Sequence, residues 1–127
     1  MPTLYIHPSH ISNIMTFCAP TNKAEYLTEC LLEVVNNRWK VDAIESGRSF
    51  YHKLTYKVGR KYIKVMDSTV GIKNQSNGVF MFVDKETGAC YKPASWAAPA
   101  KGIRFYIESL VETPEVVDPY GSFLYIR

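Results

Sequence analysis

The side chains of this sequence that could do chemistry are mostly cations interleaved with aromatic rings. Between Ser46 and Met66 the chain has six basic residues and no acidic one, and the stretch from Thr87 to Ile107 is also free of acids. Lysine and arginine neutralise phosphates, and aromatic rings stack on bases at about 1–3 kcal/mol each. This pattern favours a surface that binds single-stranded nucleic acid.

We expect two segments to form that surface. In the first, basic and aromatic residues alternate as on one face of a strand; in the second, two prolines stiffen a loop around Trp96. The expected contact residues are Arg48, Tyr51, Lys53, Lys57, Arg60, Lys61, Lys92, Trp96, Lys101 and Arg104. The alternatives are a plain solvated strand face, where lysines prevent edge aggregation, and a Trp96 that folds back onto the sheet as a lid.

Catalytic candidates are fewer. His52 and Arg60, with Lys53 and Tyr91, would supply a base and phosphate contacts for metal-independent cleavage of RNA beside a 2′-hydroxyl. Only an analogy with the folds of small ribonucleases supports this set, and a lone histidine on an apolar face is more often partly buried and hydrogen-bonded. The sequence leaves enzymatic activity open but favours a protein without one, and we expect no cofactor and no metal site.

The elements that position these residues begin with a helix, which we expect over residues 22–38. Asn22 is a suitable N-cap, and Glu25 completes a capping box. Apolar residues follow at helical spacing, and Asn36-Asn37 weakens the end.

After Gly47 the hydrophobic period changes to two, which predicts strands. We place them at 50–58, 61–66, 79–84, 89–92, 103–107 and 123–126, with a loop over 67–78. Gly59 is expected in a type II′ turn and Gly88 in the left-handed position after a type I turn. Phe50, Phe80 and Phe82 are the expected aromatic core.

The whole chain fits one α+β domain, 1–127, with an extended arm at 1–21, the helix at 22–38 and mainly strands over 48–127. The helix is expected to pack on an antiparallel meander of four to six strands. The 127 residues include 13% aromatics, which excludes a disordered chain. Three widely spaced cysteines indicate a reducing compartment, and no apolar run is long enough for a membrane span.

Several segments carry a resemblance to a known group. They are Val79 to Gly88, the run Y-K-P-A-S-W-x-A-P-A-K-G from Tyr91 to Gly102, and Pro119-Tyr120-Gly121 before a short aromatic end. They resemble a group of small uncharacterised proteins of tailed bacteriophages. The resemblance implies a viral origin and a location in the host cytoplasm or the virion, and it implies no activity.

Three functions therefore stay open. The first is a non-enzymatic phage accessory protein that binds nucleic acid. The second is a module that docks on a virion component or inhibits a host or defence factor, with homo-oligomers allowed. The third is a small metal-independent ribonuclease.

Overall fold

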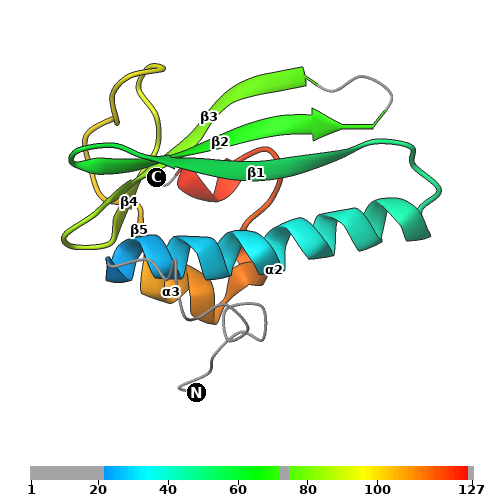
Figure 1. Ribbon diagram of the computed structural model, residues 1–127, viewed down its shortest axis with the longest axis horizontal. Helices are drawn as coiled ribbons and strands as arrows, with labels where there is room; N and C mark the ends of the chain where they lie inside the picture. Colours follow the sequence, from blue (N-terminus) through cyan, green and yellow to red (C-terminus); the bar gives the residue numbers. More distant parts are fainter. Residues whose placement is uncertain (1–21, 72–74, 126–127) are drawn as a thin grey trace, which may run out of the picture.

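One long helix lies along a five-stranded antiparallel sheet in the computed structural model, which describes residues 22–71 and 75–125 (Figure 1). The expected arm at 1–21, with His7, His10 and Cys18, lies outside the described residues. The expected α+β class is confirmed, and the five strands fall within the four to six predicted.

The helix, α2, spans Lys23–Glu45. Its N-cap is the expected one, because the Oδ1 atom of Asn22 accepts the Glu25 N–H at 2.9 Å. The predicted end at residue 38 is wrong. Asn36, expected to weaken the helix, instead accepts the Leu54 N–H at 2.8 Å and donates to the Leu54 carbonyl at 2.8 Å. This tertiary contact overrides a poor helix propensity.

The strands follow one another in chain order across the sheet. They are β1 (Tyr51–Val58), β2 (Tyr62–Val70), β3 (Gln75–Asp84), β4 (Ala89–Tyr91) and β5 (Phe105–Tyr106). The register places Leu54 opposite Asp67, and Val65 lies opposite both Tyr56 and Met81. Because side chains alternate along a strand, each central strand has one face toward α2 and one away from it.

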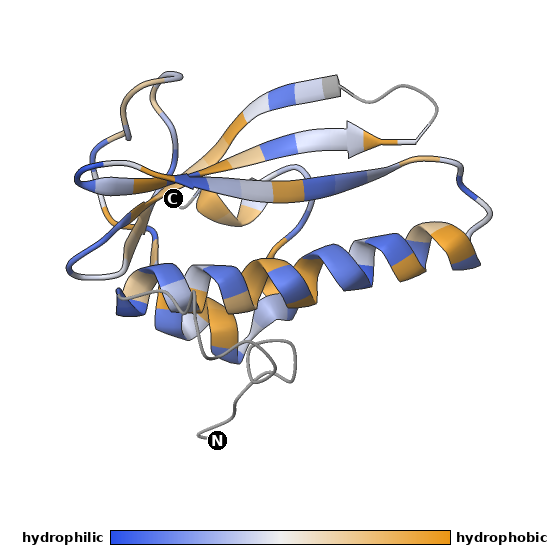
Figure 2. Cartoon of the chain, viewed as in Figure 1, coloured by the Kyte–Doolittle hydropathy of each residue, from blue (hydrophilic) through white to orange (hydrophobic). Residues whose placement is uncertain are grey.

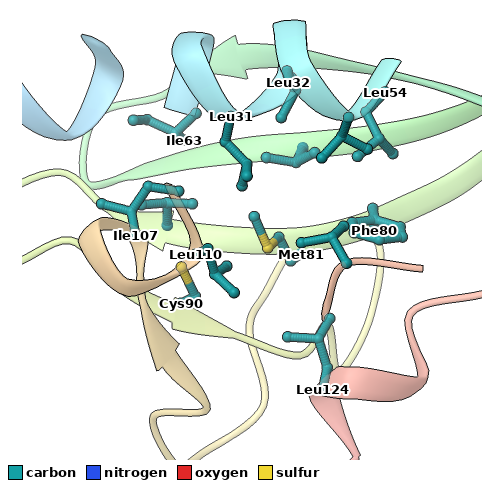
Figure 3. Close-up of a cluster of buried hydrophobic side chains, with 14 of the residues drawn as sticks. Leu31, Leu32, Leu54, Ile63, Phe80, Met81, Cys90, Ile107, Leu110 and Leu124 are labelled. Atoms are coloured by element: carbon teal, nitrogen blue, oxygen red, sulfur yellow. The ribbon is translucent and has the colours of Figure 1, made fainter. Parts of the chain in front are cut away.

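The core lies between α2 and the inner face of the sheet (Figure 3). A bulge admits an extra residue: Val65 pairs with Met81 while Met66 pairs with Val79, so Phe80 between them also turns inward. The buried side chains come from every layer: Leu31, Leu32, Val35, Trp39, Leu54, Ile63, Val65, Phe80, Met81, Val83, Cys90, Ile107, Leu110, Val117 and Leu124. In Figure 2, apolar residues recur along α2 among hydrophilic ones, as a helix covering one sheet face requires.

The loop predicted over 67–78 is wrong. Strand β2 continues to Val70 and β3 already begins at Gln75. The polar residues that suggested a loop pair across the two strands, since Asn77 Nδ2 donates to Thr69 Oγ1 at 2.9 Å. Turn-forming composition was therefore misleading in a strand pair whose side chains satisfy one another.

The strand predicted at 103–107 is present but shorter, as β5, and the strand predicted at 123–126 is wrong. Ile107 starts a short helix, α3 (Ile107–Glu112), after a strand of only two residues. The segment at 123–126 holds instead a 3-10 turn, η2 (Ser122–Leu124), entered through Gly121 at φ 70°. A second 3-10 turn, η1, spans Pro114–Val116.

Two turn predictions have opposite outcomes. Gly88 has φ 78°, which confirms its left-handed position, and the Asp84 carboxylate accepts the Glu86 and Thr87 N–H groups within the turn. The type II′ turn at Gly59 is wrong, because its φ is not positive. Gly59 instead lies close to the returning strand, where an added Cβ would be 3.0 Å from the Tyr62 carbonyl oxygen.

Phe80 and Phe82 are buried as expected, whereas Phe50 is 47% exposed. Phe50 precedes the first strand, beyond the part of the sheet that α2 covers with buried side chains.

Candidate functional site

The outer face of the sheet, turned away from α2, carries the expected alternation of lysine and aromatic residues. Leu54 is buried on the inner face, so its neighbours Lys53 and Thr55 point outward, and Tyr51 and Lys57 share their face. In the register, Lys57 lies opposite Lys64 of β2. Two ammonium groups therefore stand on adjacent strands of one exposed face.

Lys64 joins the hairpin of β1 and β2 to the loop between Pro93 and Pro99 that carries Trp96, which we call the tryptophan loop. Its Nζ atom is 4.9 Å from the centroid of the Trp96 ring and 6.0 Å from that of Phe82. Trp96 remains 57% exposed, so its ring rests partly on the sheet and partly in solvent. The Trp96 side chain is therefore neither fully exposed nor folded back onto the sheet as a closed lid. Lys64 was not among the predicted contacts, although it belongs to the same acid-free run and its register to Lys57 would have revealed it.

The tryptophan loop is held in place by its own backbone. Pro93 and Pro99 form an isolated bridge, and the Ala100 N–H donates to the Lys92 carbonyl at 2.7 Å. This closed loop crosses the outer face and presents Trp96 near its tip. The two predicted segments are thus parts of one surface, which we call the outer-face patch: Lys53, Lys57, Lys64 and Trp96.

A second group of rings borders the patch near the hairpin turn. The Tyr62 ring meets Phe82 and Tyr91 edge-on, with centroids 5.9 and 6.0 Å away, and Lys61 Nζ lies 5.4 Å from the Tyr62 centroid. Burial, followed by the neighbouring Tyr62 and Asp84, raises the pKa of Tyr91, so its phenol stays neutral at physiological pH. Asp84 is occupied by the turn that it caps.

Other predicted residues lie away from the patch. Arg48 precedes β1 and Arg60 follows it, so they stand at opposite ends of an eight-residue strand, roughly 26 Å long at about 3.3 Å per residue. Lys101 is exposed at the base of the loop. The Arg104 Nε atom is buried without a hydrogen-bond partner. Lys92 points to the other side, with its Nζ 4.7 Å from the Tyr125 centroid.

The set considered for RNA cleavage is not brought together. His52 faces inward, its neighbour Lys53 faces outward, and Arg60 lies in the hairpin turn. Tyr91 pairs with Phe82 on the outer face. His52 is partly buried and satisfied, as the simpler interpretation expected: its Nδ1 lies 3.0 and 3.2 Å from the two Asp67 oxygens.

His52 and Asp67 line an open pocket of about 340 Å³ on the inner side of the sheet. Lys92 and the turn around Tyr120 complete its rim, and the floor includes Phe80 and Leu124. No sequence pattern predicted this pocket, because its walls come from five separate segments of the chain.

Within residues 22–71 and 75–125, no three His, Cys, Asp or Glu side chains lie close enough together to hold a metal ion. In the same part of the chain, no helix is long and apolar enough to cross a membrane.

These features define a class of small α+β protein in which one helix backs an antiparallel meander and the opposite face carries cations and an exposed indole. The chain belongs to a family of unknown function, DUF7717, which it matches over residues 13–126. No curated protein and no solved structure matches it.

Proposed function

We propose that this protein binds single-stranded nucleic acid through the outer-face patch, as a non-enzymatic accessory protein of a tailed phage in the host cytoplasm. The observation that carries the proposal is the stacking of Lys64 under the Trp96 ring at 4.9 Å. That contact places a half-exposed indole beside the lysines of the hairpin in a single surface.

The two kinds of side chain have separate tasks. Lys53, Lys57 and Lys64 neutralise phosphates without regard to sequence, and binding releases the counterions of those phosphates. The open face of Trp96 stacks on a base. The closed loop holds the indole in place before binding, so little side-chain entropy is lost.

A single strand suits this surface better than a duplex. Bases of a duplex are stacked on one another, so an exposed ring meets only their edges, whereas unpaired bases offer whole faces. Apart from its lysines the patch has few hydrogen-bonding groups, so we expect only a weak preference for the base sequence of the strand.

The test is fluorescence anisotropy with a labelled 15-nucleotide DNA strand of mixed sequence, titrated at 50 and 200 mM salt. Lys64→Ala and Trp96→Ala are each expected to weaken binding about tenfold or more. Lys40→Ala, which removes an exposed lysine from α2, is the matched control and should leave affinity unchanged. The slope of log K against log salt should fall by about 0.7 for each lysine that contacts a phosphate and is removed.

Tryptophan fluorescence gives an independent measurement. Trp39 is 5% exposed and Trp96 is 57% exposed, so a Trp39→Phe variant reports on Trp96 alone. The strand should quench this emission at saturation. No binding at 50 mM salt, or equal losses for Lys64→Ala and Lys40→Ala, would overturn the proposal and leave docking on a protein as the function to pursue.

A further inference from the structure

The pocket on the inner side of the sheet holds a histidine whose orientation is fixed. Both Asp67 oxygens lie within 3.2 Å of His52 Nδ1. Trp39 and Tyr120 each meet the imidazole edge-on, with ring centroids 6.4 and 5.7 Å away. Because Asp67 engages Nδ1, the Nε2 atom is the ring nitrogen available to a ligand.

The charges of the pocket favour an anion. Among its lining residues, Asp67 and Lys92 are the charged side chains. The Asp67 side chain is only 14% exposed and its oxygens already face the imidazole, whereas the His52 side chain is 25% exposed. The imidazole therefore stands between the carboxylate and a ligand, and Lys92 supplies the ammonium group across the pocket.

The rim presents two exposed aromatic rings, and hydrogen bonds hold the turn that carries one of them. Tyr120 is 81% exposed, yet the turn that carries it is tied to Asp118, which accepts the Gly121 N–H at 3.1 Å and the Ser122 N–H at 2.9 Å. Tyr125 is 59% exposed beside Lys92. Rings that a rigid turn holds open to solvent bind planar ligands with little loss of conformational freedom.

The apolar floor extends this pocket into the core. Phe80 and Leu124 both belong to the buried cluster drawn in Figure 3, and both line the pocket. Gly121 packs above them, where an added Cβ would be 3.7 Å from the Phe80 ring. The volume of about 340 Å³ is within the range of small-molecule sites.

We propose that this pocket binds a nucleoside monophosphate. The phosphate contacts Lys92 Nζ and His52 Nε2, and the base stacks on Tyr120. A planar ring joined to a phosphate is the ligand chemistry that matches an ammonium group, an oriented imidazole and exposed phenol rings around one opening. This site faces away from the outer-face patch and does not depend on the function proposed for it.

The test is isothermal titration calorimetry with AMP and CMP, beside ribose 5-phosphate, which lacks a base, and inorganic phosphate. We expect one saturable site for the nucleotides and at least fivefold weaker binding of ribose 5-phosphate. Tyr120→Ala should weaken AMP binding to the level of ribose 5-phosphate while leaving the latter unchanged. Lys92→Met should weaken all phosphate-bearing probes about tenfold or more.

Tyr120→Ala should leave the fold intact, because that side chain is 81% exposed. Lys57→Ala, on the opposite face, is the control and should bind AMP normally. Two results would each overturn the proposal: no heat of binding at millimolar AMP, or AMP affinity that does not change in Tyr120→Ala and Lys92→Met. Oligonucleotide binding by the same variants reports separately on the outer-face patch.

Discussion

Asn36 and Asn37 are adjacent residues of α2 with the same side chain, but their surroundings differ. The Asn36 amide makes two hydrogen bonds to the backbone of Leu54 on the outer edge of β1, whereas Asn37 is exposed. Asn36→Ala removes the partners of the Leu54 N–H and carbonyl, whose hydrogen bonds are partly buried, at a cost of about 1–3 kcal/mol. We expect the urea midpoint to fall clearly for Asn36→Ala and to stay or rise slightly for Asn37→Ala, since alanine is the better helix former. Equal midpoints would contradict this role for Asn36.

The buried thiol of Cys90 is expected to make the folded state less stable at alkaline pH. Burial raises the pKa of this thiol from 9.0 to about 12. The folded state therefore keeps a proton that the unfolded chain loses above pH 9, so this contribution to stability is complete below pH 9 and is lost as the pH rises toward 12. The free energy of unfolding should fall by up to about 1.4 kcal/mol per pH unit in this range.

Urea titrations at pH 8, 9 and 10 measure that slope. The Cys90→Ala variant should have a flatter slope between pH 9 and 10, whatever its absolute stability. Tyr56, with its pKa raised to about 12 mainly by burial, adds a similar loss only above pH 10. A slope unchanged by Cys90→Ala would show that the thiol is not protected.

At the scale of elements, the sequence predicted what depends on local pattern. The helix start at Asn22, the hairpin alternation and the turn at Gly88 all follow from residues close together in the chain. The helix end was missed because Asn36 is satisfied by Leu54, which lies eighteen positions later. The length of β2 was missed because its polar half pairs with β3 and with His52. Long-range partners decided each of these outcomes.

The contrast between local pattern and long-range pairing also explains which residues of the candidate site the sequence could predict. Alternation placed Lys53 and Lys57 on one face correctly, and the acid-free loop identified Trp96. Lys64 required the register between strands, and the side toward which Lys92 points required the loop that follows it. Composition therefore located the segments, and only the pairing of strands assigned their side chains to faces.

The ends of β1 and β2 meet at Gly71, which predicts a strong effect there. Its φ is 138°, and an added Cβ would lie 2.4 Å from the Ser49 carbonyl oxygen and 2.8 Å from Phe50 Cα. Gly78 has a similar φ of 130° with nothing within 4 Å, so it is the matched control. We expect Gly78→Ala to cost about 1–3 kcal/mol from backbone strain alone, and Gly71→Ala to cost clearly more. Thermal unfolding of both variants measures the difference, and similar melting temperatures would contradict the close approach.

At the scale of the whole molecule, the net charge of +3 does not show that the two faces of the sheet carry different kinds of side chain. The outer face has lysines around an exposed indole, and the inner face has α2 over most of its length and the pocket beyond it. Lys92 links them, since its carbonyl closes the tryptophan loop while its side chain lies in the pocket. The sheet thus separates the two proposed binding surfaces by one layer of backbone.

This separation predicts that the two surfaces act independently. Substitutions at sites without shared partners add within about 0.3–0.5 kcal/mol. Lys64→Ala combined with Tyr120→Ala should therefore lose as much oligonucleotide affinity as Lys64→Ala alone, and as much AMP affinity as Tyr120→Ala alone. Anisotropy and calorimetry on the four proteins of this cycle supply the comparison. A coupling above about 1 kcal/mol in either measurement would mean that one strand contacts both faces, with its backbone on Lys64 and its terminal nucleotide in the pocket.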